Sequence, residues 1–194
     1  MFFRIARQGT QPAVQAIAGA GRAGELHLRF DETRFRPMES DLRKLFGLEG
    51  HTVVVTGASA GLGVEFAHAV ASAGARLVLM ARREDRLRTL ADELKTAYGT
   101  DCLVVATNLG RADERERAFA AIDSCFGGAV DVLVNNAGTA PTGKAERQWP
   151  DAWHEALELN LNAAFHCALL ARSRMRRERR QGRIINVSSI FGHL

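Results

Sequence analysis

An α/β fold built on a doubly wound parallel sheet is predicted by three features of this 194-residue sequence. From Thr52 onward, short apolar runs alternate with longer helical patterns, which is typical of parallel strands joined by crossover helices. The apolar runs are continuous, as strands covered on both faces require. A glycine-rich turn, T-G-A-S-A-G-L-G at residues 56–63, directly follows the first run, as in sheets that bind nucleotides.

The elements follow in order from these patterns. Strands are expected at residues 52–56, 76–80, 102–106, 130–135 and 183–187. Helices are expected between them at residues 62–73, 84–98, 112–126 and 151–177. The last helix should start near Pro150, because proline is tolerated in the first turn and Asp151 faces the positive helix end. Right-handed crossovers then place the five strands, numbered along the chain, in the order 3-2-1-4-5.

Residues 1–47 stand outside this alternation, so we expect an irregular N-terminal extension followed by one nucleotide-binding domain at residues 48–194. Residues 38–46 could form a short helix that leads into the first strand. The first 24 residues lack Asp and Glu but carry Arg4, Arg7 and Arg22. This stretch resembles an organellar transit peptide only faintly, and a loosely ordered extension is favoured because it is rich in Gly and Ala.

Composition favours a soluble, cytoplasmic globular protein without a membrane partner. Hydrophobic residues make up 46% and charged residues 25% of the chain, and no uncharged stretch reaches the roughly 18 residues of a membrane span. The net charge of +4 arises from seven arginines between Arg172 and Arg183. A solvated helix end explains them better than nucleic-acid binding, because no aromatic side chains interleave with them. The three cysteines suggest neither disulfides nor a metal site but small buried residues.

The glycine-rich turn predicts a phosphate-binding site. Gly57 allows a tight turn, and Gly61 and Gly63 let backbone amides and the next helix approach without a β-carbon in the way. The helix N-terminus supplies unpaired N–H groups and partial positive charge for a diphosphate. The N-N-A-G sequence at residues 135–138 follows the fourth strand at the point where the strand order reverses, which is where such sheets bind ligands. A purely structural Asn-Gly turn is the alternative, and the glycine-rich turn beside it makes the ligand site the favoured interpretation.

The end of the second strand indicates which dinucleotide binds. A carboxylate there would bind the ribose hydroxyls of NAD, whereas arginine accommodates a 2′-phosphate. The chain has Ala81 at this point, followed by Arg82 and Arg83. NADP(H) is therefore favoured over NAD(H). Asn108, after the third strand, can donate or accept one hydrogen bond near the adenine.

Four motifs in register resemble the short-chain dehydrogenase/reductase family: the glycine turn, N-N-A-G, Asn160 within L-E-L-N-L-N, and I-I-N-V-S-S at residues 184–189. The resemblance runs from about Leu48 to the last residue and implies a Rossmann-like domain that interconverts a small-molecule carbonyl and alcohol by hydride transfer. It assigns Ser189 to the substrate oxygen and Asn160 to a water-linked proton path. By this resemblance we expect the chain to be C-terminally incomplete, and association into a homo-oligomer stays open.

The cofactor-binding residues expected from the motifs and the resemblance lie at four strand ends. They are Gly57, Ser59, Ala60, Gly61, Leu62, Gly63, Arg82, Arg83, Asn108, Leu109, Asn136, Ala137 and Gly138.

The family's Tyr-x-x-x-Lys pair is absent after Ser189. The single tyrosine, Tyr98, ends a helix that starts at the cofactor edge and should lie roughly 20 Å away. Because a positioned proton donor contributes about 10²- to 10⁴-fold in rate, we expect turnover by this chain to be impaired. The alternative is a non-catalytic NADP(H)-binding module, or a fragment that needs a partner chain. The histidines His154, His166 and His193 show neither metal-ligand spacing nor an acidic partner for hydrolysis.

Overall fold

The computed structural model describes residues 14–15, 29–30, 45–140 and 150–189. The chain separates into two compact units, Met1–Gly47 and Leu48–Leu194. In the first unit, the two-residue strands β1 (Val14–Gln15) and β2 (Arg29–Phe30) pair in antiparallel fashion. Of the short helix expected at residues 38–46, only positions 45 and 46 lie within the described residues, and both are helical.

The second unit contains a five-stranded parallel sheet. Its strands are β3 (Thr52–Thr56), β4 (Arg76–Ala81), β5 (Cys102–Ala106), β6 (Val132–Asn135) and β7 (Arg183–Asn186). They lie in the order β5-β4-β3-β6-β7, which confirms the predicted order 3-2-1-4-5. The order reverses between β3 and β6, so the crevice for a ligand is expected beyond the carboxyl ends of these two strands.

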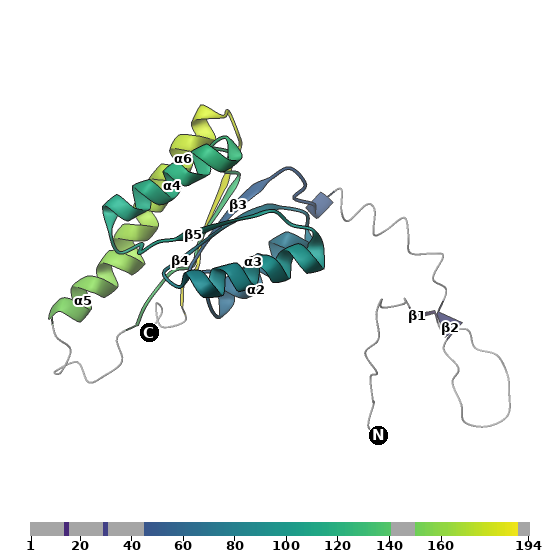
Figure 1. The fold of residues 1–194 in the computed structure, drawn as a ribbon, viewed down its shortest axis with the longest axis horizontal. Helices are drawn as coiled ribbons and strands as arrows, with labels where there is room; N and C mark the ends of the chain where they lie inside the picture. The colour runs from purple at the N-terminus through teal and green to yellow at the C-terminus, as the bar shows by residue number, and fades with distance from the viewer. Residues whose placement is uncertain (1–13, 16–28, 31–44, 141–149, 190–194) are drawn as a thin grey trace, which may run out of the picture. The chain divides into compact units, whose positions relative to one another are not determined.

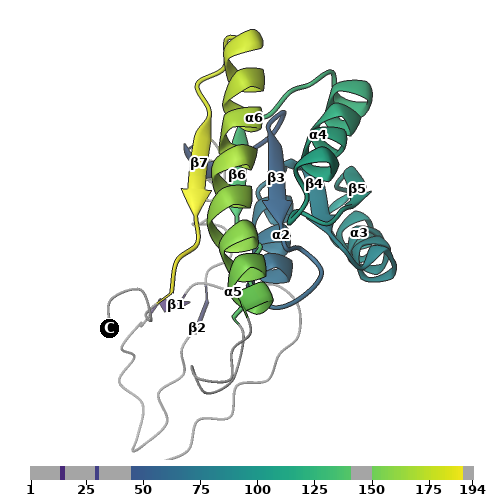
Figure 2. The same ribbon diagram turned by 90° about the vertical axis from the view of Figure 1, so that its left-hand side faces the viewer.

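Helices cover both faces of this sheet (Figures 1 and 2). The helices α2 (Leu62–Ser72) and α3 (Glu84–Tyr98) lie on one face. The other face carries α4 (Ala112–Phe126) and a long helical segment made of α5 (Pro150–Leu157), the π-helix η2 (Glu158–Ala163) and α6 (Ala164–Arg177).

Alternation along the strands divides the core into two layers. Val53 and Val55 face the α2–α3 layer, whereas Val54 between them faces the α4–α6 layer. All three side chains are fully buried. Both faces of a central strand must therefore be apolar, which is why the runs read continuously in the sequence.

The long helix differs from the expectation of one uninterrupted α-helix at residues 151–177. The π-helical turn at Glu158–Ala163 interrupts it, and such turns occur frequently at functional sites. The strand expected at residues 130–135 begins only at Val132. Before it, the Asp131 carboxylate accepts the Thr52 backbone N–H at 2.8 Å, and the Asp131 N–H donates to Thr52 O at 2.9 Å.

The expectation that all three cysteines are buried is wrong for Cys125, which is exposed on the last turn of α4. Cys167 is buried and Cys102 is half-buried. Burial raises the pKa of both of these thiols to about 11, so they stay protonated at neutral pH.

The arginine-rich end of α6 is partly a structural clamp rather than wholly a solvated face. Arg174, only 8% exposed, and Arg177 both pair with Asp123 on α4. Arg180 pairs with the buried Asp131 at 2.6 Å. The pairs fasten the end of the long helix to its neighbours on the sheet. No helix within the described residues is long and apolar enough to cross a membrane.

Candidate nucleotide-binding site

A hollow of about 360 Å³ lies beyond the carboxyl ends of the central strands. It is bounded by the glycine turn after β3, the end of β4, the loop after β5 and the N-N-A-G segment after β6. Its lining comprises Gly57, Ser59, Ala60, Leu62, Ala81, Arg82, Arg83, Thr107, Asn108, Leu109, Asn136, Ala137, Gly138 and Leu159. The position at the reversal of strand order is the one at which open α/β sheets bind ligands.

The glycine turn is packed too closely for side chains at two positions. A Cβ on Gly57, whose φ is +68°, would lie 2.9 Å from the Ala137 Cα. A Cβ on Gly63 would lie 2.3 Å from the Gly57 carbonyl oxygen. The two glycines therefore let α2 and the N-N-A-G segment approach the turn, which brings three backbone segments to one point.

Gly61 requires glycine for a different reason. Its φ is +58°, which L side chains rarely adopt, yet a Cβ there would meet nothing within 4 Å. Gly61 is also the N-cap of α2, and no side chain caps this helix end. The N-terminus of α2 lies beside the hollow, because Leu62 lines it, and helix-end amides favour an anion such as a pyrophosphate. These residues fit a dinucleotide.

Thr56 organises the turn and was missed as a site residue in the sequence. Its hydroxyl is buried and donates to Val134 O at 3.2 Å. The same oxygen accepts the backbone N–H groups of Asn136 at 2.9 Å and Ala137 at 3.0 Å. One hydroxyl therefore holds the N-N-A-G segment against the end of β3. The sequence signal that could have identified Thr56 is its position directly before Gly57 of the glycine turn.

The end of β4 carries the expected cationic pair. Ala81 lies at the wall of the hollow, and Arg82 and Arg83 follow it at the rim. Arg83 donates to the Ser59 hydroxyl from Nε at 3.2 Å and from Nη2 at 2.9 Å. Ser59 belongs to the glycine turn, so the Arg83 guanidinium spans the gap between two neighbouring walls.

Polar groups of the loop after β5 bond to one another and to the start of α4. The Asn108 side-chain oxygen accepts the Gly110 N–H at 3.1 Å, and the Asn108 N–H donates to the Glu114 carboxylate at 2.6 Å. Leu109 is buried at 4% exposure while still lining the hollow. The loop is therefore a preformed wall, with Leu109 as its apolar surface.

Asn160 lies in the π-helical turn and holds the opposite wall. Its side-chain oxygen accepts the Thr139 N–H at 2.8 Å, and its side-chain nitrogen donates to Thr139 O at 2.8 Å. A Cβ on the adjacent Gly138 would approach the Asn160 oxygen to 3.4 Å. This doubly bonded amide fixes the chain just beyond the N-N-A-G segment.

Ser189 is exposed and follows β7 by three residues. Gly138 follows β6 by the same number, and Asn135 and Asn186 are register partners in the two parallel strands. The Asn135 side chain donates to the Asn186 side-chain oxygen at 2.9 Å, which ties these strand ends together. Ser189 and Gly138 therefore leave the sheet at the same edge.

The structure brings eleven of the thirteen expected cofactor residues to one hollow. The other two, Gly61 and Gly63, shape the turn and the helix end from outside its lining. Among the described residues, no group of three His, Cys, Asp or Glu is placed to hold a metal ion. His166 accepts a hydrogen bond from Arg115 at 3.1 Å, and His193 lies outside the described residues.

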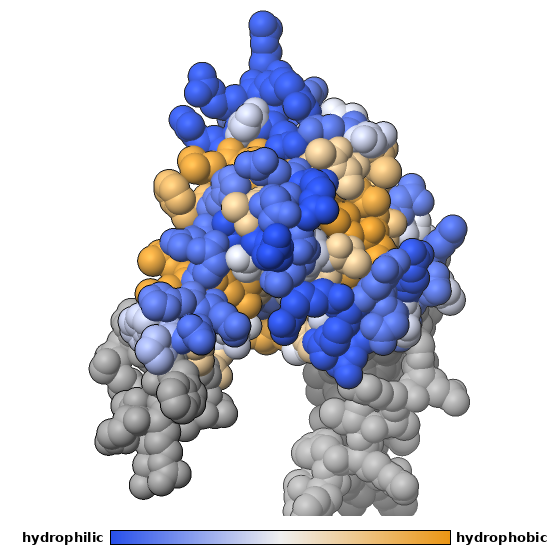
Figure 3. Space-filling view, turned by 60° about the vertical axis from the view of Figure 1, so that its left-hand side comes forward, coloured by the Kyte–Doolittle hydropathy of each residue, from blue (hydrophilic) through white to orange (hydrophobic). Residues whose placement is uncertain are grey.

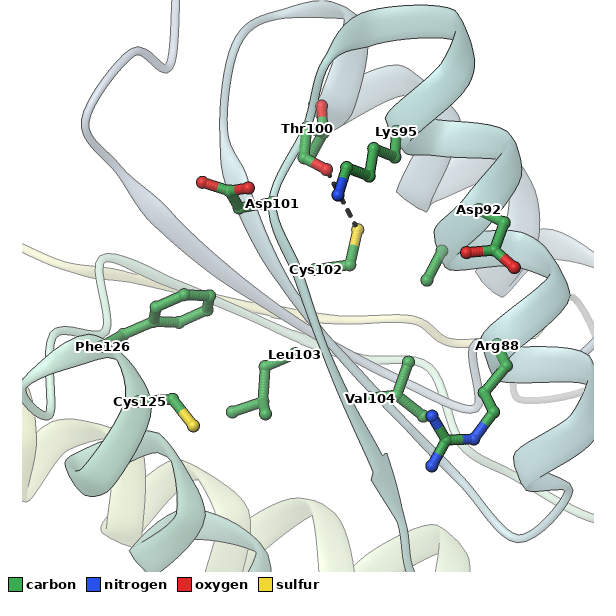
Figure 4. Close-up of a pocket in the computed structure, with 11 residues that line it drawn as sticks. Arg88, Asp92, Lys95, Thr100, Asp101, Cys102, Leu103, Val104, Cys125 and Phe126 are labelled. Atoms are coloured by element: carbon green, nitrogen blue, oxygen red, sulfur yellow. Dashed lines mark hydrogen bonds between the residues drawn. The ribbon is translucent and has the colours of Figure 1, made fainter.

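A larger hollow of about 630 Å³ lies elsewhere, along the outer edge of β5 between α3 and α4 (Figure 4). Arg88 and Lys95 from α3 and Cys125 and Phe126 from α4 flank it, and Cys102 begins its strand wall. It follows an open sheet edge and reaches the start of β5, away from the carboxyl ends. The larger hollow has neither a glycine turn nor a helix N-terminus. The smaller hollow has both, so it is the better nucleotide site.

Comparison with known proteins shows the family to which the chain belongs. A family model described as short chain dehydrogenase matches residues 51–194. A short chain dehydrogenase of Pseudocercospora fijiensis is 39% identical over 147 residues, which are 74% of this chain and 46% of that relative. The 3-oxoacyl-acyl-carrier-protein reductase FabG of Aquifex aeolicus is 33% identical over 147 residues, which are 75% of this chain and 58% of that relative.

A similar fold is seen in the crystal structure of L-sorbose reductase from Gluconobacter frateurii, complexed with NADPH and L-sorbose. The TM-score is 0.70 at 36% sequence identity, over 75% of this chain and 54% of that chain. The present chain thus spans about half the length of the relatives it matches.

Proposed function

The chain belongs to the short-chain dehydrogenase family, and from this premise we propose that it binds NADP(H) in preference to NAD(H) and serves an oxidoreductase that interconverts a small-molecule carbonyl and alcohol. The observation that carries the proposal is the convergence of the glycine turn, the uncapped α2 N-terminus and Arg82 on one hollow. Residues 48–194 are proposed to form the nucleotide-binding domain, with residues 1–47 as an extension.

The preference for a 2′-phosphate rests on charge at the end of β4. No carboxylate stands at Ala81 to bind ribose hydroxyls, and Arg82 and Arg83 supply two cations at the rim. Arg83 already contacts Ser59, so a phosphate placed there would meet a guanidinium and a hydroxyl together. Hydrogen bonds between ionised groups are about twice as strong as neutral ones.

The residues of this chain would orient the reaction. When bound, the nicotinamide cofactor supplies or accepts the hydride. Ser189 would hold the substrate oxygen, and Asn160 would support a proton path from its place in the π-helical turn. Tyr98 is remote from this edge, because it ends α3 and contacts the ring of His68. We therefore propose that this chain alone turns over slowly.

A second candidate is a non-catalytic NADP(H)-binding module, or a fragment that works with a partner chain. It is favoured by the same observation, the remoteness of Tyr98. The two candidates differ in one measurement, oxidation of NADPH with a panel of ketones. Turnover at an ordinary rate would exclude the module, and binding without turnover would favour it.

The binding proposal is tested by titrating NADPH and NADH into the chain and following nucleotide fluorescence. Arg82→Ala should weaken NADPH by about 10- to 100-fold, because a hydrogen bond to a charged group contributes about 1.5–3 kcal/mol. The same variant should leave NADH unchanged. Ala81→Asp should weaken NADPH and strengthen NADH.

The matched control is Arg88→Ala, which removes an exposed arginine of α3 away from the nucleotide hollow. Its surface pair with Glu84 should contribute little. Equal affinity of the wild-type chain for the two coenzymes would overturn the preference, and binding of neither would overturn the function.

The chain is further proposed to act in the cytoplasm and to form a homo-oligomer. Five large apolar side chains are exposed along the long helix at intervals of four residues: Trp153, Leu157, Leu161, Phe165 and Leu169. Apolar patches interrupt the hydrophilic surface on this side of the unit (Figure 3). An apolar stripe of this length is typical of a protein–protein contact.

A further inference from the structure

Arg115 on α4 is a buried cation whose contacts extend beyond its own helix. The residue is only 4% exposed. Its Nη1 donates to Leu109 O at 2.6 Å and to the Glu158 carboxylate at 2.9 Å, and its Nε donates to His166 Nδ1 at 3.1 Å. A buried charge is tolerated only when its hydrogen bonds are met, so these three contacts define where the guanidinium lies.

The three partners belong to different segments around the nucleotide hollow. Leu109 forms the apolar wall after β5. Glu158 is the first residue of the π-helical turn, and His166 lies in α6 just after that turn. Arg115 therefore connects one wall of the hollow to both ends of the turn.

Glu158 extends this connection through the turn itself. Its second carboxylate oxygen accepts the Asn162 side-chain N–H at 2.6 Å. The hydrogen bonds from Asn162 and Arg115 hold the pKa of Glu158 below its ordinary value. The carboxylate thus stays charged at neutral pH and bridges Arg115 to a residue four positions further along.

Asn160 lies between Glu158 and Asn162, and its amide is paired with both backbone groups of Thr139. A continuous series of contacts therefore runs from Leu109 on one wall, through Arg115 and the π-helical turn, to Thr139 beside Gly138 on the other. Asn160 can meet Thr139 in this way only if the turn keeps its present winding.

We propose that Arg115 is a positioning residue, which fixes the π-helical turn so that Asn160 holds Thr139 and the two walls of the nucleotide hollow keep their separation. Its part in binding rests on the proposed function, whereas its part in fixing the turn does not. The planar guanidinium is needed because it donates in three directions at once, which an ammonium on a flexible stem does less well.

The test compares Arg115→Met with Arg174→Met. Both variants remove a buried arginine that joins α4 to the long helix, but Arg174 pairs with Asp123 away from the hollow. We expect Arg115→Met to weaken NADPH about 10-fold and to speed hydrogen exchange at the Thr139 backbone N–H, measured by NMR without nucleotide. Arg174→Met should lower the melting temperature but leave both readouts unchanged.

Arg115→Lys keeps the inference testable if Arg115→Met does not fold. It keeps the charge, so it should fold, yet it should still show faster exchange at Thr139. A double variant, Arg115→Met with Glu158→Leu, removes both charges and should recover thermal stability without recovering NADPH affinity.

Wild-type exchange at Thr139 in the single Arg115 variants would overturn the inference. Recovery of affinity in the double variant would also overturn it, since charge burial rather than positioning would then explain the loss. Failure of the wild-type chain to bind NADPH would sink the proposed function alone, because the exchange measurement needs no nucleotide.

Discussion

Gly63 shows how strongly a single residue constrains the nucleotide site. The oxygen 2.3 Å from its missing Cβ belongs to the backbone of Gly57, so it cannot move aside as a flexible side chain would. Gly63→Ala must push α2 away from the turn. We expect a loss of about 1–3 kcal/mol in the free energy of unfolding and at least about a 10-fold loss of NADPH affinity, or about 1.4 kcal/mol.

Chemical unfolding and NADPH titration measure the two effects, and Gly99→Ala is the matched control. Gly99 ends α3 with φ +68°, but nothing lies within 4 Å of its missing Cβ. This control should lose about 1–2 kcal/mol through backbone strain alone and bind NADPH normally. Unchanged affinity in Gly63→Ala would show that close packing at the turn is not what shapes the site.

Site residues could be predicted from the sequence where their role depends on neighbouring positions in the chain. They were missed where their role depends on contacts that form only in the folded structure. Gly57 stands out through the spacing of the glycines around it. Arg82 stands out because it follows Ala81, where a carboxylate would bind the ribose of NAD. Arg115 does not, because an arginine on α4 reads as a surface residue until Glu158 and His166 are brought beside it. The assigned roles of Ser189 and Asn160 stay predictions.

The helices α4 and α6 form a clamp through Asp123, Arg174 and Arg177. Partial burial by itself raises the pKa of Asp123, but hydrogen bonds from the two arginines outweigh it and hold the pKa below its ordinary value. A carboxyl group whose pKa is lower in the folded than in the unfolded chain stabilises the fold when it is ionised. This stabilisation is fully present above the unfolded pKa, about 3.9, and is lost as pH falls through the folded pKa.

Asp123→Asn should therefore lower the free energy of unfolding at pH 7 by about 1–3 kcal/mol, since Arg174 stays buried without its counter-charge. The difference from the wild type should shrink as pH falls below about 4. Urea unfolding of both chains from pH 7 to pH 3 measures it. A difference that is constant with pH would show that the carboxylate charge contributes nothing to the clamp.

At the scale of elements, the strands could be predicted because each is buried on both faces and so appears as an apolar run. The π-helical turn could not, because L-E-L-N-L-N carries the same apolar spacing as an α-helix. The contacts made by this turn join residues far apart in the sequence, from Arg115 to Glu158 and from Asn160 to Thr139. No periodicity in residues 151–177 records them.

For the second unit as a whole, the exposed stripe on the long helix is the strongest sign of association. Leu161 and Phe165 are 61% and 65% exposed, on the side of the helix away from the buried Ala163 and Cys167. Acidic residues lie in the first half of this helix and arginines in the last turns of α6. Two copies packed antiparallel would join the stripes and place opposite charges side by side, as a two-fold interface allows.

We therefore expect the wild-type chain to be a dimer by light scattering at micromolar concentration, and Leu161→Glu with Phe165→Glu to convert it to a monomer. Tyr98→Glu, which changes an exposed aromatic on α3, should leave the mass unchanged. High salt should weaken the dimer only partly, because salt screens the charge pairs but not the apolar contact. A monomeric wild-type chain, or a dimer that survives both substitutions, would assign the stripe to a different partner.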